Sequence, residues 1–209
     1  MTRKLLLGLL ALPLFLQAQQ TTEYPNDYLT PEFHAGRREA FRAMMPKNSV
    51  AFFFASQVRV RNNDVDYIYA QSKNFYYFTG LEEPNSLLVM FKEPVTILGA
   101  TGTDFLFVQP RNPQQEMWTG KILGVDGVKD RYKFANVFTH DKFKPGIIDI
   151  SKTDSVFTLF YNEDIISKFK RRPDPLSRMA MLTDSLITSS HRPVADRSTT
   201  AMMRKLRGI

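Results

Sequence analysis

The sequence contains no cysteine, and this absence excludes several kinds of chemistry. Without cysteine the chain forms no disulfide, no thiolate metal site and no cysteine nucleophile, and it has no cysteine for lipid attachment. Histidine is also scarce, because only His34, His140 and His191 are present. They lie too far apart for an H-x-x-x-H or H-E-x-x-H metal motif. We therefore predict no metal ligands within this chain.

Motifs for nucleophilic catalysis and for phosphate binding are missing as well. No G-x-S-x-G sequence occurs, and Gly120, Gly124 and Gly127 lack the spacing of a phosphate loop or a dinucleotide-binding loop, which favours turns there. Asp64 and Asp66 would share one face of an extended segment, but nothing near them indicates the separated pKa values of an acid–base pair. We predict no catalytic residue in this chain.

Long hydrophobic runs are limited to one, at the N-terminus. The twelve apolar residues from Leu5 to Leu16 follow the basic Arg3 and Lys4 and precede a small residue, Ala18. The run is too short to span about 30 Å of hydrocarbon comfortably. The pattern is that of a signal peptide over residues 1–18. It predicts an exported protein, periplasmic or extracellular, with no membrane anchor after cleavage.

Positive charge is in moderate excess. The formal charge of +7 falls to +5 once Arg3 and Lys4 are removed with the signal peptide. A local basic run is formed by Lys168, Lys170, Arg171 and Arg172. The aromatic residues Phe52–Phe54 lie in a continuous apolar stretch instead of alternating with basic residues, which favours a core strand over a nucleic-acid surface. We predict no nucleic-acid partner.

The remaining composition, 43% hydrophobic and 23% charged, is typical of a globular protein. After an extended leader over residues 19–31, Thr30 and Pro31 form a helix start signal, and Pro46 ends that helix. Four charged residues of this helix are predicted to form a solvated face: Arg37, Arg38, Glu39 and Arg42.

Short apolar runs then alternate with helical patterns. Strands are predicted at residues 50–55, 86–91, 96–98, 105–109 and 156–161. Helices are predicted at 175–189 and 196–205. Strands interleaved with helices indicate an α/β domain with a mixed or largely parallel sheet. The chain ends within a basic helical pattern, which indicates a truncated domain boundary.

The stretch from Arg61 to Glu83 resembles a known pattern, D-x-x-Y-x-[FY]-R-Q-x-S-x-F-x-Y-L-[TS]-G followed by Glu-Pro. The residues in register are Asp64, Tyr67, Tyr69, Gln71, Phe75, Tyr77, Thr79, Gly80, Glu83 and Pro84. The pattern belongs to the N-terminal domain of the creatinase/aminopeptidase P/prolidase superfamily. One position departs from it, because Ala70 stands where the family usually has arginine.

Two further stretches agree with the same family in the same order. Upstream, 41–54 resembles the family's helix-to-strand entry, with Met45, Pro46 and Ser49 matching. Downstream, 105–124 resembles F-V-x-x-R-x-P-x-x-E-x-W-x-G. The matching residues there are Phe107, Val108, Arg111, Pro113, Glu116, Trp118, Gly120 and Gly124. The resemblance covers nearly the whole mature chain, 32–209.

The resemblance implies an RNase H-like fold, a mixed β-sheet flanked by helices, over residues 32–192. Residues 193–209 would begin the linker helix to a catalytic pita-bread domain beyond Ile209. In the family, that domain binds two divalent ions, typically manganese, and releases an N-terminal residue that precedes proline. The implied partners are the chain's own catalytic domain, peptides with proline second, and one or three further copies in a homodimer or homotetramer.

The resemblance also implies roles for three residues. Asp64 would help to hold the substrate's amino end, Trp118 would project towards a neighbouring subunit's active site, and Arg207 would face the cleft. Independently of the resemblance, the position of Trp118 between Glu116 and Gly120 predicts an exposed side chain on a loop. Tyr76, Tyr77 and Phe78 are predicted to pack against the sheet, with a tight turn at Thr79 and Gly80. Two alternatives stay open: the N-terminal domain of a prolidase, and a stand-alone assembly or binding module.

Overall fold

The structure is a computed structural model that describes residues 29–62, 65–159, 174–191, 194 and 196–208. The predicted signal peptide, most of the predicted leader and the basic run near residue 170 lie outside these residues. Within the described part, no helix combines the length and the apolar character needed to cross a membrane.

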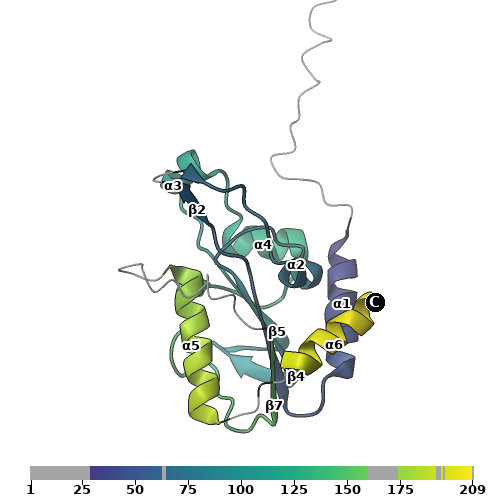
Figure 1. Cartoon of the computed structure of the whole chain (residues 1–209). Helices are drawn as coiled ribbons and strands as arrows, with labels where there is room; N and C mark the ends of the chain where they lie inside the picture. Colours follow the sequence, from purple (N-terminus) through teal and green to yellow (C-terminus); the bar gives the residue numbers. More distant parts are fainter. Residues whose placement is uncertain (1–28, 63–64, 160–173, 192–193, 195, 209) are drawn as a thin grey trace, which may run out of the picture.

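A five-stranded mixed sheet forms the centre of the molecule, with strand order β6-β5-β4-β1-β7 (Figure 1). Strand β4 is antiparallel to β1 and to β5, whereas β7 is parallel to β1 and β6 is parallel to β5. The strands are β1 (Ser49–Phe54), β4 (Leu87–Ile97), β5 (Ala100–Val108), β6 (Val137–Thr139) and β7 (Ser155–Thr158). The predicted mixed α/β sheet is therefore confirmed.

One long strand replaces two predicted ones. Strand β4 continues through Lys92 and Pro94, where its pairing with β5 shifts register between Met90 and Val95. A bulge of this kind accommodates proline, which cannot donate a ladder hydrogen bond. The hairpin then turns at Leu98 and Gly99, both with positive φ, as a two-residue turn of the twist-compatible type requires.

Helices cover both faces of the sheet. One face packs against α1 (Pro31–Met44), α2 (Lys73–Thr79), α4 (Gly124–Tyr132) and α6 (Asp196–Arg207). The other packs against α5 (Pro175–Ser190), the short 3-10 helix η2 (His140–Lys142) and the following segment up to Ile150. Because both faces are covered, all six residues of β1 are buried. Phe53 points to the α1 side and Phe52 to the α5 side.

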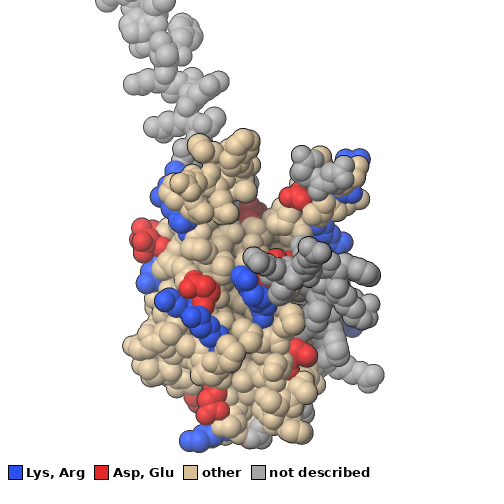
Figure 2. Space-filling model, turned by 90° about the vertical axis from the view of Figure 1, so that its left-hand side faces the viewer, with Lys and Arg blue, Asp and Glu red and all other residues tan. Residues whose placement is uncertain are grey.

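Two segments project from this body. The small sheet of β2 (Val60–Asn62) and β3 (Val65–Asp66) has only exposed residues, and α3 (Pro113–Thr119) has no buried residue. Figure 1 places both at the same end of the molecule. Figure 2 shows a notch between two projections at that end, with basic and acidic side chains interspersed over the visible face.

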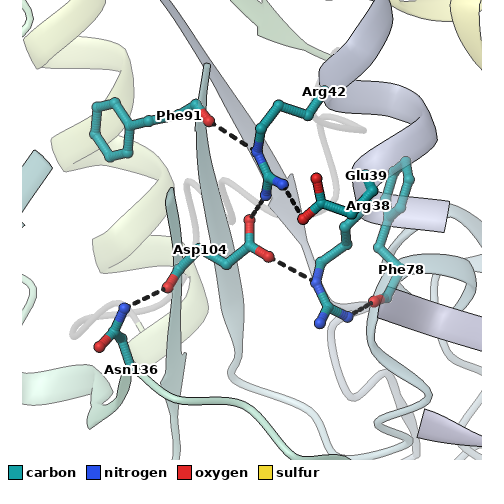
Figure 3. Close-up of polar contacts among 7 residues, drawn as sticks. All are labelled: Arg38, Glu39, Arg42, Phe78, Phe91, Asp104 and Asn136. Carbon is teal, nitrogen blue, oxygen red and sulfur yellow. Dashed lines mark hydrogen bonds and ion pairs between the residues drawn. The ribbon is translucent and has the colours of Figure 1, made fainter. Parts of the chain in front are cut away.

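The predicted solvated face of α1 is wrong for two of its arginines. Arg38 and Arg42 are buried, and both form ion pairs with Asp104 of β5 (Figure 3). Arg38 Nε donates to Asp104 Oδ2 over 2.8 Å and Arg38 Nη1 to the Phe78 carbonyl over 2.6 Å. Arg42 Nε donates to the carbonyl of Phe91 over 3.1 Å. These hydrogen bonds and ion pairs connect α1 to strands β4 and β5 and to helix α2.

A half-buried histidine lies under α5. Burial of His140 in η2 lowers its pKa, an effect that Arg178 strengthens and Asp141 opposes. The unfolded chain therefore binds a proton first, near pH 6.5, so stability should fall as the pH falls below that value. We expect the melting temperature of the wild type to decrease more between pH 7 and pH 5 than that of His140→Gln. The exposed His191→Gln serves as control, and equal slopes for all three proteins would contradict the prediction.

Candidate functional site

The stretch that carries the family resemblance is organised by Gln71. Its Oε1 accepts from the backbone N–H groups of Ser56 and Ser72, both over 2.8 Å. Its Nε2 donates to the carbonyls of Leu81 and Glu83, both over 3.0 Å. One side chain thus joins the segment after β1, the start of α2 and the segment that leads into β4. Its role is to hold these three backbone segments in fixed positions relative to one another.

The neighbours of Gln71 differ sharply in environment. Tyr69 donates its hydroxyl to the Ser56 carbonyl over 3.3 Å, and burial raises the pKa of this phenol well above its usual range. Tyr69 therefore stays protonated and remains a donor. Ala70, between the two, is exposed. An arginine at position 70, as in the family pattern, would extend from the surface, and the hydrogen bonds of this segment do not depend on it.

Helix α2 and its ends follow from the same stretch. Ser72 caps the first turn by accepting from the Phe75 N–H, and Gly80 ends the helix with a φ of 71°. Thr79 Oγ1 donates to the Phe75 carbonyl and accepts from the Leu81 N–H. The predicted turn after Thr79 is confirmed. The three aromatic residues before it lie on a helix, with Phe78 fully buried against the sheet.

Trp118 lies on a helix, so its predicted loop position is wrong. Asn112 caps α3 by accepting from the Gln114 N–H, Pro113 occupies the first turn, and Gly120 ends the helix. This Asn-Pro start signal could have been read from the sequence, as Thr30 and Pro31 were. The expected exposure is correct, because the Trp118 side chain is 88% exposed and that of Met117 79%.

An ion pair steadies the start of α3. Arg111 Nε donates to Glu116 Oε1 over 2.8 Å, and this hydrogen bond holds the pKa of Glu116 below its usual value. Because α3 buries no residue of its own, capping and this ion pair are its main local support.

Of the other two predicted site residues, the structure describes only Arg207. Asp64 falls outside the described residues, between the exposed strands β2 and β3. Arg207, in the last turn of α6, donates from Nη2 to Asn74 Oδ1 over 2.6 Å, and its guanidinium lies over the ring of Tyr77. Figure 1 separates this end of α6 from α3, so the fold does not bring Arg207 and Trp118 together within one chain.

Nothing in the described part of the chain resembles a metal centre. No group of three or more histidine, aspartate or glutamate side chains is placed to hold an ion there. The described residues therefore offer no site for the two divalent ions, which the resemblance places in a separate catalytic domain. What the described surface offers is exposed apolar area on α3 and on the β2–β3 hairpin.

Comparison with known proteins identifies the domain. The family described as "Aminopeptidase P, N-terminal domain" matches residues 34–160. The Xaa-Pro aminopeptidase of Haemophilus influenzae is 31% identical over 112 residues, which are 54% of this chain and 25% of the relative. That of Escherichia coli is 35% identical over 95 residues, 46% of this chain and 21% of the relative. Intermediate cleaving peptidase 55 of Schizosaccharomyces pombe is 29% identical over 172 residues, 79% and 34% respectively.

Solved structures share the fold. Pseudomonas aeruginosa aminopeptidase PepP superposes with a TM-score of 0.59 at 25% identity, over 79% of this chain and 36% of that one. The low-pH form of E. coli aminopeptidase P gives 0.58 at 22% identity, over 78% and 33%. The predicted fold class is thereby confirmed, and the chain spans between about a fifth and just over a third of the length of these proteins. Since the family match covers more than half of the sequence, this chain belongs to the aminopeptidase P N-terminal domain family.

Proposed function

We propose that this chain is the N-terminal, non-catalytic domain of an exported Xaa-Pro aminopeptidase that releases an N-terminal residue preceding proline. The family match over residues 34–160 carries the proposal. Two of the relatives quoted above are named Xaa-Pro aminopeptidase, and each is much longer than the part that matches. The cleavage would then belong to a catalytic domain outside this chain.

The proposed metal chemistry belongs to that second domain. The described residues of this chain supply no set of ligands for two manganese ions. When bound in the catalytic domain, such ions would lower the pKa of a shared water molecule and polarise the scissile carbonyl. The described side chains of this domain would act by shaping access to that site.

The proposed task of this domain is to form part of the active-site mouth and to contact neighbouring subunits in a dimer or tetramer. Six of the ten exposed large hydrophobic residues in the described part of the chain support this, because they lie on α3, on the β2–β3 hairpin or at the two positions that directly follow β3. They are Val60, Val65, Tyr67, Ile68, Met117 and Trp118. Exposed apolar side chains grouped in this way are typical of contact surfaces. Asp64, which lies outside the described residues, is proposed on the resemblance alone to help hold the substrate's ammonium group.

Export is proposed on the pattern of residues 1–18. The matching experiment is N-terminal sequencing of the mature protein from the periplasmic or extracellular fraction. We expect the mature chain to begin directly after Ala18. An intact N-terminus on protein recovered from the cytoplasm would contradict export without affecting the family assignment.

Activity is tested on the full-length protein with Xaa-Pro tripeptides. We expect release of the first residue in the presence of Mn²⁺ and its loss with a chelator. A peptide with alanine in place of proline is the control and should be cleaved much more slowly. Hydrolysis of Xaa-Pro dipeptides alone would instead identify a prolidase. Self-association with no hydrolysis of any of these peptides would favour a stand-alone assembly module.

A further inference from the structure

The last turn of α6 is fastened to α2 by polar contacts from both sides. Arg207 Nη2 donates to Asn74 Oδ1 over 2.6 Å and lies 3.4 Å from the Lys73 carbonyl. The Arg207 guanidinium carbon is 5.1 Å from the centre of the Tyr77 ring, within cation–π range. In return, the Tyr77 hydroxyl donates to the carbonyl of Leu206 over 3.3 Å. We call these contacts the α2–α6 clasp.

Apolar packing already holds α6 against the domain, and the clasp fixes the orientation of its last turn. Met203 is buried, and Leu206 is partly buried against the same core cluster, so the apolar side of α6 is docked without the clasp. Apolar contacts are not directional, whereas a guanidinium held by an acceptor and an aromatic ring has one favoured position. Arg204 and Lys205, in the same turn, are exposed.

The α2 side of the clasp is itself held in place. Ser72 caps α2, and Gln71 ties its start to the segment that follows β1. At its other end, the Tyr77 carbonyl lies 3.0 Å from His34 Nδ1 of α1, which is buried. Motion of α2 relative to α1 or to the segment after β1 would break the contacts of His34 and Gln71. The clasp therefore connects the last turn of α6, through α2, to α1 and to the segment that follows β1.

We propose that Asn74 and Tyr77 are positioning residues that act through Arg207. They fix the direction in which the chain leaves α6 and, with it, the placement of this domain against the segment that follows. The proposal rests on the proposed function in one respect, namely that a catalytic domain follows. If that domain's active-site mouth is shaped by this one, loosening the clasp alters substrate access more than the chemical step.

The experiment uses the full-length protein and three variants that weaken the clasp: Arg207→Ala, Asn74→Ala and Tyr77→Phe. Arg204→Ala removes a guanidinium from an exposed position of the same helical turn and is the matched control. Asn74→Asp keeps the oxygen acceptor and should restore the clasp. We expect amide exchange in the last turn of α6 to be about tenfold faster in Arg207→Ala, as for the loss of one charged hydrogen bond.

Kinetics separate positioning from a general loss of folded protein. For an Xaa-Pro tripeptide, we expect the KM of Arg207→Ala and Asn74→Ala to rise about three- to tenfold while kcat stays within about twofold. Loss of folded enzyme alone would lower the apparent kcat and leave KM unchanged. Asn74→Asp should have a KM close to that of the wild type.

The outcomes distinguish this proposal from the proposed function. If Arg207→Ala matches Arg204→Ala in both exchange and KM, the positioning role is overturned, and faster exchange with an unchanged KM overturns it as well. If the protein cleaves no Xaa-Pro peptide, the proposed function fails, and solution X-ray scattering then decides the positioning role. A scattering profile that changes in Arg207→Ala, and not in Arg204→Ala, supports positioning, and identical profiles overturn it.

Discussion

Replacing Asp104 with alanine is expected to lower the free energy of unfolding by about 3–5 kcal/mol, because buried Arg38 loses the carboxylate that it pairs with and buried Arg42 is left with the carboxylate of the exposed Glu39. The Arg38 and Arg42 side chains are 7–8% exposed, and each pairs with a different oxygen of Asp104. Neither guanidinium can lose its charge at an accessible pH, so burial would have to be relieved by moving α1. Arg38 also lies over the Phe134 ring, which ties the same helix to the segment before β6.

The measurement is urea unfolding followed by far-ultraviolet circular dichroism, since the exposed Trp118 would report poorly on the core. Asp130→Ala removes the same group from an exposed position of α4 and should change stability by no more than about 0.5 kcal/mol. Asp104→Asn should fall between the two, because it keeps one oxygen acceptor. If Asp104→Ala and Asp130→Ala have equal midpoints, the network contributes nothing to stability.

The Asp104 network also explains why the position of α1 could be predicted from the sequence, whereas the burial of Arg38 and Arg42 could not. The start at Thr30 and Pro31 is a local signal, and the structure confirms it with a hydrogen bond from the Phe33 N–H to Thr30 Oγ1. The burial of Arg38 depends on Asp104, which lies 66 residues later. No local pattern connects these positions. Polarity therefore indicated a solvated face where a buried ion pair forms.

Short elements were missed for a related reason. Strand β6 has three residues and α2 has seven, which is too few for a periodic pattern to be recognised. Both depend on contacts beyond their own segment: β6 pairs with β5, and Gln71, just before α2, binds Ser56, Leu81 and Glu83. The resemblance to a family located this stretch correctly and named its fold. It did not reveal that Gln71 serves as a structural joint or that Arg207 is engaged with α2.

Gly80→Ala is expected to destabilise the domain by about 2–4 kcal/mol, because the new methyl group meets both backbone strain and a packed neighbour. Gly80 has a φ of 71°, and a Cβ built there would lie 2.7 Å from His34 Nε2 and 3.2 Å from a ring carbon of Tyr132. Because His34 is buried between α1 and α2, its ring has little room to move. The change should therefore push α2 away from α1 and weaken the α2–α6 clasp as well.

Substitutions at two other glycines distinguish the effect of backbone strain from that of the close contact with His34. Gly146 also has a positive φ, of 79°, but no atom lies within 4 Å of its added Cβ, so Gly146→Ala should cost only the backbone strain of about 1–2 kcal/mol. Gly36 lies within α1 with open space around it, so Gly36→Ala should stabilise by about 0.5–1 kcal/mol. In urea unfolding, we expect the free energy of unfolding to be lowest for Gly80→Ala, higher for Gly146→Ala, higher again for the wild type and highest for Gly36→Ala. If Gly80→Ala costs no more than Gly146→Ala, the close contact with His34 is relieved without loss, and the tight packing of α1 on the end of α2 is not a source of stability.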